Sequence, residues 1–137
     1  NCILVKDNHI KMAGSIKNAI DLLRAKAQHT FKIEVECESM EMVQEALDCG
    51  VEVIMFDNMD LDEMKAALKL VNGRAMTEAS GGINEQTIVP IAETGVDIIS
   101  VGDLTHTVKA LDISLDVSDI KPSAVRTIER LRASGRG

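Results

Sequence analysis

The sequence predicts an α/β fold, a parallel βα-barrel of the TIM type of which this chain supplies the carboxy-terminal portion. Short β-branched runs alternate with longer amphipathic ones, which is typical of a parallel sheet with right-handed crossovers. The strand-like runs recur about every 20 residues, the length of one βα unit with short loops. Nearly every run ends in a polar group, as barrel strands do where they build an active site.

The expected elements follow from the hydrophobic periods along the chain. Apolar residues spaced by three and four predict amphipathic helices, as in Ile16, Ile20 and Leu23. The β-branched runs predict strands at 2–6, 32–37, 52–56, 75–79 and 97–101, with a further candidate at 113–117. The helices are expected between them, at 15–28, 39–49, 60–71, 84–94 and 104–110.

Capping signals and a weak internal repeat support these boundaries. Ser39 is expected to cap the helix that follows it, and Gly50 and Gly95 are expected to end helices. Residues 46–54 echo residues 92–99, as two copies of one βα unit would. The first strand is not followed by a GxGxxG motif, which disfavours a dinucleotide-binding open sheet. Polar groups at nearly every strand end favour the barrel, because an open sheet would gather them at one switch point.

The chain is expected to form one domain or part of one. Residues 1–117 are expected to make the carboxy-terminal part of the barrel. Residues 118–137 are expected to make a loop with Pro122, a helix over 123–132 and a frayed tail. The chain starts inside a strand-like run and without a Met, so we expect a piece of a longer protein whose amino-terminal part is missing.

Composition disfavours several classes of function. Of the 137 residues 45% are apolar, which is enough for a core and too many for a disordered chain. The net charge of -7 disfavours nucleic-acid binding. No apolar run reaches the ~18 residues of a membrane span, so no membrane association is expected. The three cysteines (Cys2, Cys37 and Cys49) lack a metal or redox motif, which indicates reduced thiols in a cytosolic, cytoplasmic protein.

Charged side chains lie at the ends of the first three predicted strands. Residues 6–9 are Lys-Asp-Asn-His, which fits a functional strand end and a solvated turn equally well. Glu34 and Glu36 share one face of their strand, which points to the barrel axis unless the strand is an exposed edge. Glu36 and Asp57 together would suit Mg²⁺, whereas Asp57 alone would commonly just start a loop.

Two glycine loops at neighbouring strand ends indicate phosphate binding. Ser80-Gly81-Gly82 joins a strand to a helix expected near Asn84, where backbone amides and the helix amino terminus favour an anion. The next strand ends in Ser100-Val101-Gly102-Asp103, followed by Thr105-His106. Paired glycine loops on the last strands of a barrel commonly bind one phosphate. Each loop alone is a weak signal, whereas the pair predicts a phosphate site.

These motifs together resemble quinolinate phosphoribosyltransferase (nicotinate-nucleotide pyrophosphorylase, carboxylating), the type II enzyme of NAD biosynthesis. The likeness runs in order, with suitable spacing, from residue 2 to about residue 117. It is carried by Val5-Lys6-Asp7-Asn8-His9, Ile33-Glu34-Val35-Glu36, Phe56-Asp57-Asn58, Glu78-Ala79-Ser80-Gly81-Gly82-Ile83, Val101-Gly102, Leu104-Thr105-His106 and Ala110-Leu111-Asp112-Ile113-Ser114-Leu115.

The resemblance implies transfer of a phosphoribosyl group from 5-phosphoribosyl-1-pyrophosphate (PRPP) to quinolinate with decarboxylation, giving nicotinate mononucleotide, CO₂ and pyrophosphate. It implies that Lys6 contacts the quinolinate carboxylate and PRPP. It also implies that Glu36 and Asp57 hold the ribose hydroxyls and the Mg²⁺ cofactor, largely through water. The other implied substrate-binding residues, most of them around the 5-phosphate, are His9, Ser80, Gly81, Gly82, Val101, Gly102, Asp103 and His106.

The resemblance also implies parts that this chain lacks. The family has an amino-terminal sandwich domain and first barrel strands, which carry arginines and a histidine for quinolinate. A neighbouring subunit's amino-terminal domain completes the site, so a homodimer or higher homo-oligomer is implied. We therefore expect residues 1–137 alone to be inactive. Asp103 stands where relatives often have a small apolar residue, and a carboxylate suits a phosphate loop only if it faces away.

Other interpretations stay open. A nicotinate phosphoribosyltransferase or a molybdenum-linked paralogue would share the fold and differ in the acceptor. A non-catalytic phosphosugar-binding half-barrel would bind PRPP without turnover. A purely structural barrel would tolerate alanine at Lys6, Glu36 and Asp57, and the presence of all three with both glycine loops disfavours it.

Overall fold

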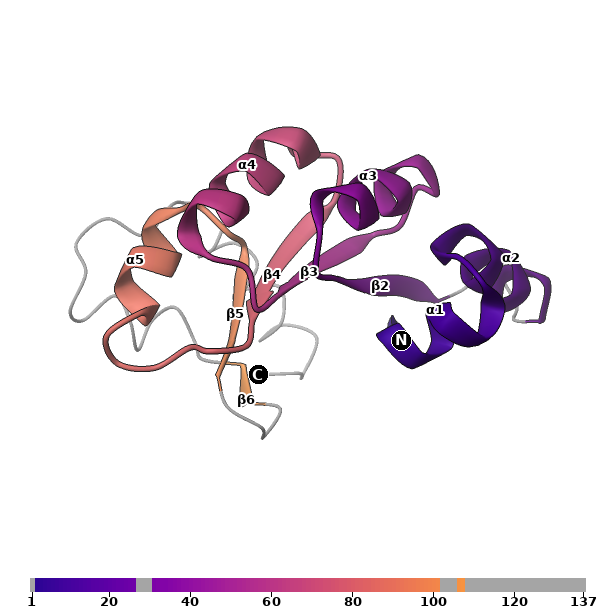
Figure 1. Ribbon diagram of the computed structural model, residues 1–137, viewed down its shortest axis with the longest axis horizontal. Coiled ribbons are helices and arrows are strands. Elements are labelled where there is room, and N and C mark those ends of the chain that lie inside the picture. Colours follow the sequence, from indigo (N-terminus) through magenta and orange to yellow (C-terminus); the bar gives the residue numbers. More distant parts are fainter. Residues whose placement is uncertain (1, 27–30, 102–105, 108–137) are drawn as a thin grey trace.

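The computed structural model describes residues 2–26, 31–101 and 106–107, which form a sheet with helices packed on one face (Figure 1). The sheet has six strands in the order β1-β2-β3-β4-β5-β6. Its first five strands are parallel, and the short β6 pairs with β5 in the antiparallel sense. The strands are β1 (Cys2–Val5), β2 (Lys32–Cys37), β3 (Val53–Asp57), β4 (Met76–Ser80), β5 (Ile98–Val101) and β6 (His106–Thr107).

Helices alternate with the parallel strands along the chain, and each pair of consecutive parallel strands lies side by side in the sheet. The helices are α1 (Asp7–Ala13), α2 (Ile16–Lys26), α3 (Met40–Asp48), α4 (Leu61–Val71) and α5 (Ile88–Glu93). The predicted α/β class is confirmed: a five-stranded parallel sheet consistent with part of a TIM-like barrel. Within the part of the chain that the structure describes, no helix is long and apolar enough to span a membrane.

The predicted parallel strands are confirmed to within one residue at either end. Three of the predicted helices, those over 15–28, 39–49 and 60–71, are confirmed as α2, α3 and α4. Their caps behave as expected, since the Ser39 hydroxyl accepts a hydrogen bond from the Met42 amide at 3.3 Å. Gly50 and Gly95 have positive φ angles of 67° and 93°, as left-handed residues after a helix do.

One helix was not predicted and another is shorter than predicted. α1 occupies residues 7–13, where the sequence left a functional strand end and a solvated turn as alternatives. Asp7 favours the first turn of α1 and pairs with Lys11 one turn later at 2.8 Å. The helix predicted over 84–94 begins only at Ile88, because the Asn84 side chain accepts hydrogen bonds from two following amides and forms a turn instead.

The helix predicted over 104–110 is wrong for His106 and Thr107. These two residues form β6, with Val101 opposite His106 and Ser100 opposite Thr107. Their backbone pairs with the end of β5, and pairing with a neighbouring strand overrides local helical preference. The rest of that prediction, the strand candidate at 113–117 and the whole of 118–137 lie outside the described residues.

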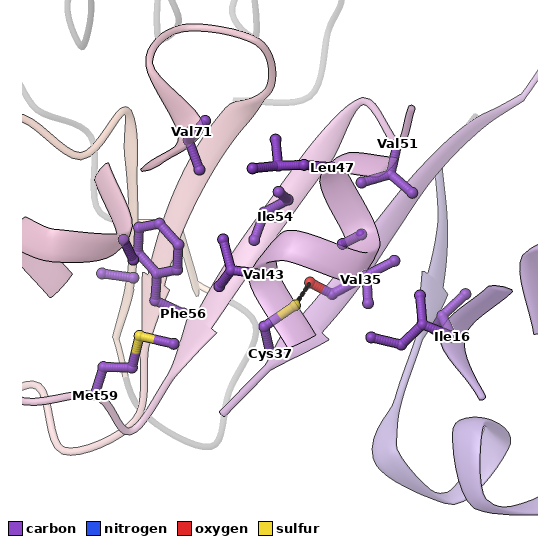
Figure 2. Packing of buried hydrophobic residues seen from close by; sticks show 14 of the residues in the cluster. Ile16, Val35, Cys37, Val43, Leu47, Val51, Ile54, Phe56, Met59 and Val71 are labelled. Carbon is purple, nitrogen blue, oxygen red and sulfur yellow. Dashed lines mark hydrogen bonds between the residues drawn. The ribbon is translucent and has the colours of Figure 1, made fainter. Parts of the chain in front are cut away.

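The apolar core lies between the helices and one face of the sheet. Figure 2 shows that Val43 and Leu47 from α3 meet Ile54 and Phe56 from β3. Phe56 is fully buried and is among the largest side chains in this core. On β2 the Val35 carbonyl accepts a hydrogen bond from the Cys37 thiol, and burial raises the pKa of that thiol to about 12. Cys37 therefore acts as a core residue and not as a reactive thiol.

The internal repeat has a structural counterpart at the amino ends of the strands. The Glu52 carboxylate, just before β3, accepts a hydrogen bond from the Ile33 amide of β2 at 2.7 Å. The Asp97 carboxylate, just before β5, accepts from the Thr77 amide of β4 at 2.9 Å and from its hydroxyl at 3.0 Å. These two acidic residues hold matching places in the repeat, and each ties its strand to the preceding one.

Candidate active site

The face of the sheet opposite the helices carries the charged side chains. Val35 is fully buried under the helices, so alternation along β2 puts Glu34 and Glu36 on the opposite face, as predicted. Because β2 is paired on both sides, the alternative of an exposed sheet edge is wrong. Residues in register form rows across this face, namely Leu4–Glu34–Val53, Glu36–Met55–Glu78 and Asp57–Ser80.

Lys6, Glu36 and Asp57 come together at the carboxyl ends of the first three strands. Burial raises the pKa of Glu36, the neighbouring Asp57 carboxylate raises it further, and the positive charge of Lys6 acts in the opposite direction. Lys6 is exposed, and both carboxylates are half-buried. The arrangement joins two mutually repelling carboxylates to one cation and leaves them accessible to a ligand.

A second pair of carboxyl groups lies deeper on the same face. Glu78 is only 9% exposed, and it accepts a hydrogen bond from the Ser100 hydroxyl at 2.8 Å. Burial raises the pKa of Glu34 to about 9, and a hydrogen bond to Glu78 together with the charge of Glu78 adds to this effect. A protonated Glu34 has a hydrogen to donate, while its buried Oε1 atom has no hydrogen-bond partner among the described residues.

The role of Glu78 was missed in the sequence, although a signal for it exists. Glu78 and Ser80 are two residues apart on β4, so alternation puts both on the face that carries Glu36 and Asp57. Its link to Glu34 and Ser100 depends on the register of the four strands from β2 to β5, which the sequence does not give.

The raised pKa of Glu34 predicts a pH dependence of stability. In the unfolded chain this carboxyl ionises near its ordinary pKa of 4.5, whereas in the folded protein it keeps its proton until about 9. The contribution of Glu34 to the free energy of unfolding is therefore fully present below the unfolded-state pKa of 4.5. It is lost as the pH rises toward the folded-state pKa of about 9. We expect the free energy of unfolding to fall over this range, and Glu34→Gln to flatten the fall.

Urea denaturation of the two proteins at a series of pH values measures this effect. Glu41→Gln, which changes an exposed glutamate on α3, is the matched control and should leave the slope as it is in the original chain. If the free energy of unfolding of Glu34→Gln fell with pH as steeply as that of the original chain, a group other than Glu34 would be responsible for the pH dependence.

The glycine loop after β4 packs directly against Asp57. Gly81 and Gly82 have φ angles of 82° and 64°, in the left-handed region that favours glycine. A Cβ atom at Gly81 would lie 3.2 Å from Asp57 Oδ1 and 3.1 Å from the Asn58 nitrogen. The Thr87 hydroxyl donates to the Gly82 carbonyl at 3.2 Å and fixes the end of the loop. A turn therefore separates this loop from α5, so the expected helix amino terminus does not follow the glycines at once.

Of the remaining predicted site residues, the structure describes His9, Val101 and the backbone of His106. The exposed His9 accepts a hydrogen bond from the Lys6 amide at its Nδ1 atom (3.1 Å), so the neutral ring carries its proton on Nε2. Val101 and His106 face each other across the β5–β6 pair, which brings their backbones together. Gly102 and Asp103 lie outside the described residues.

Metal binding would rest on few protein ligands. Residues 2–26, 31–101 and 106–107 contain no group of three or more His, Cys, Asp and Glu side chains that could hold a metal ion. Glu36 and Asp57 offer two adjacent carboxylates. Mg²⁺ commonly binds through one or two carboxylates, with water and substrate phosphates completing its shell. The donor set fits a metal ion that arrives with a phosphorylated substrate.

Comparison with protein families and with known proteins finds matches over most of the chain. Residues 1–116 match the family described as quinolinate phosphoribosyl transferase, C-terminal domain. Over 116 residues the chain is 47% identical to the probable nicotinate-nucleotide pyrophosphorylase (carboxylating) of Bacillus subtilis, covering 85% of this chain and 40% of that protein. A protein of the same description from Methanocaldococcus jannaschii is 41% identical, with 85% and 44% covered.

A solved structure agrees with these relatives. The crystal structure of nicotinate-nucleotide pyrophosphorylase from Ehrlichia chaffeensis superposes with a TM-score of 0.72 at 42% identity, covering 77% of this chain and 38% of that one. The chain thus spans about two fifths of the length of the relatives it matches. The glycine loop, Lys6, Glu36 and Asp57 all lie within the matched residues.

Proposed function

Since this chain belongs to the family of quinolinate phosphoribosyltransferase carboxy-terminal domains, we propose that it supplies the PRPP-binding half of an enzyme that makes nicotinate mononucleotide from quinolinate in NAD biosynthesis. The observation that carries the proposal is the meeting of Lys6, Glu36 and Asp57 beside the Ser80–Gly82 loop. One phosphorylated sugar can reach all of these groups at the carboxyl ends of neighbouring strands.

The charges of the site suit the chemistry of phosphoribosyl transfer. When the bond from C1 of the ribose to pyrophosphate breaks, positive charge develops on the ribose ring. The Glu36 and Asp57 carboxylates stabilise that charge. The Lys6 ammonium holds the quinolinate carboxylate and PRPP, and the backbone of the glycine loop holds the 5-phosphate. The second glycine loop, with Gly102 and His106, completes the phosphate contacts.

Glu36 and Asp57 would also hold Mg²⁺, largely through water. Burial raises the pKa of Glu36 and the neighbouring Asp57 carboxylate raises it further; a bound divalent cation would relieve the repulsion between the two carboxylates, which supports this assignment. Held there, such an ion would supply positive charge to neutralise the pyrophosphate leaving group.

The complete enzyme needs more than these residues. We propose that residues 1–117 are the carboxy-terminal part of its barrel, and that quinolinate-binding arginines come from other segments and from a partner subunit in a homodimer or higher oligomer. We also propose a cytoplasmic location. Under this proposal the 137-residue chain alone gives no turnover.

A chimeric enzyme tests the function. The 116 matched residues of the Bacillus subtilis relative are replaced by those of this chain, and the product is assayed with PRPP, Mg²⁺ and either quinolinate or nicotinate. We expect nicotinate mononucleotide and CO₂ from quinolinate and no product from nicotinate. Product from nicotinate would favour a nicotinate phosphoribosyltransferase. Binding of PRPP without turnover would favour the non-catalytic half-barrel.

Replacing Asp57 should affect the binding of the two substrates to this chimera differently. We expect Asp57→Ala to weaken the binding of Mg²⁺–PRPP by about 100-fold and that of quinolinate by much less, because a charged hydrogen-bond partner of the metal and ribose is lost. Isothermal titration calorimetry with each ligand measures both affinities. Asp48→Ala, on the exposed face of α3, is the control and should change neither. Equal losses for both ligands in Asp57→Ala would contradict the metal role.

A further inference from the structure

Two residues other than glycine have a positive φ angle in the described ranges, and they are both asparagines. Asn58 has a φ of 54° and Asn72 a φ of 48°. Asn72 ends α4, where its amide donates to the Leu68 carbonyl at 3.0 Å, and a left-handed residue is common at such a place. Asn58 follows a strand, so helix capping does not explain its conformation. An unusual backbone conformation beside a candidate active site points to a functional constraint.

The turn at Asn58 is joined to the glycine loop by backbone contacts. The Asn58 amide donates to the Ser80 carbonyl at 2.8 Å, one residue beyond the last register pair of β3 and β4. A Cβ atom at Gly81 would lie 3.1 Å from that same amide nitrogen and 3.3 Å from the Asn58 Cα. A Cβ atom at Gly82 would lie 3.5 Å from Asn58 Oδ1. The Gly81 backbone therefore packs closely against the Asn58 backbone, and Gly82 lies in ordinary contact with the Asn58 side chain.

We propose that Asn58 is a positioning residue, whose left-handed backbone holds the Asp57 carboxylate and the Ser80–Gly82 loop at a fixed separation. This inference rests on the proposed function, because it assigns the carboxylate to the ribose and metal of PRPP and the loop to its 5-phosphate. A single PRPP molecule must meet both groups at once. The distance between them is then set by the turn and not by the ligand, which lowers the cost of ordering the site on binding.

The residue type follows from the backbone. Asparagine adopts the left-handed region more readily than most residues, and glycine adopts it without penalty. Alanine favours other regions, so Asn58→Ala should draw the residue 58 amide away from the Ser80 carbonyl and separate the two loops. Asn58→Gly should keep the hydrogen bond. The Asn72 site offers a matched control, since Asn72→Ala imposes the same kind of strain away from the candidate site.

Steady-state kinetics of the chimeric enzyme test the proposal. We expect Asn58→Ala to raise the KM for PRPP on the order of tenfold and to leave the KM for quinolinate within about twofold. Asn58→Gly should restore the KM for PRPP to near its original value. Asn72→Ala should lower the melting temperature as much as Asn58→Ala does and leave both KM values unchanged. If Asn58 only stabilised the fold, Asn58→Ala would not raise the KM for PRPP selectively while Asn72→Ala leaves it unchanged.

A second readout needs no substrate. Amide hydrogen exchange of the 137-residue chain should show faster exchange at residue 58 in Asn58→Ala, and unchanged exchange there in Asn58→Gly and Asn72→Ala. If the original chimera does not turn over quinolinate, the proposed function fails, and this exchange pattern still decides the role of the turn.

Four results would overturn the proposal. Asn58→Gly could be as impaired as Asn58→Ala, which would assign the effect to the side chain. Asn58→Ala could leave the KM for PRPP unchanged, or could change it no more than Asn72→Ala does. Exchange at residue 58 that is equal in all the variants would overturn it as well.

Discussion

Gly81→Ala is expected to weaken PRPP binding by about 100-fold or more while the chain stays folded. The φ angle of 82° strains any residue with a Cβ atom, and this Cβ would also sit 3.2 Å from Asp57 Oδ1 and 3.1 Å from the Asn58 backbone nitrogen. The backbone contact cannot be relieved by a side-chain rotation. The loop must therefore move away from the carboxylate, and the two groups that we assign to PRPP separate.

Calorimetric titration of Mg²⁺–PRPP into the chimeric enzyme measures the loss. Gly73→Ala is the matched control, because Gly73 has a similar φ of 77° and an added Cβ there has nothing within 4 Å. It should cost similar backbone strain and leave PRPP affinity unchanged. Comparable losses of affinity in the two variants would show that general destabilisation, and not displacement of the loop, is responsible.

Phe56→Ala is expected to lower the free energy of unfolding by about 3–5 kcal/mol. The phenyl ring is fully buried among side chains of α3 and β3, and its removal leaves a cavity that closely packed neighbours fill only in part (Figure 2). Phe56 immediately precedes Asp57, so the same change should also loosen the end of β3 on which that carboxylate sits.

Urea denaturation followed by circular dichroism measures this destabilisation. Met12→Ala provides the comparison, since Met12 is 88% exposed and its truncation should change stability by less than about 0.5 kcal/mol. A loss of under 1 kcal/mol for Phe56→Ala would mean that the core at this position is far less tightly packed than the structure indicates.

The strands and most helices could be predicted because their hydrophobic periods are strong and their caps are standard. Ile33 and Val35, for example, alternate with Glu34 and Glu36, and this pattern gave both the strand and the face that carries the charges. α1 could not be predicted, since Asp7 and Asn8 are common in turns and become helical here through first-turn and one-turn-apart contacts. β6 depends on a partner strand, which local pattern does not reveal.

Those contacts of the candidate site that follow from the fold class could be predicted from the sequence, whereas those that depend on strand register could not. The carboxyl ends of parallel strands meet at one edge, so the approach of Glu36 to Asp57 follows from the fold class. The contact of Glu34 with Glu78 and of Glu78 with Ser100 requires the register of several strands. The left-handed turn at Asn58 also has no sequence signal of its own, because asparagine is equally common in ordinary loops.

The acidic residues that precede β3 and β5 have a consequence for how this fold tolerates change. Glu52 fastens β3 to β2 and Asp97 fastens β5 to β4, at the end remote from the candidate site. Alignment of the strands is thus secured independently of the loops at the other end. The repeated fastening makes the βα unit a suitable module for grafting new binding loops in protein engineering, provided that loops which pack on each other, such as those after β3 and β4, are exchanged together.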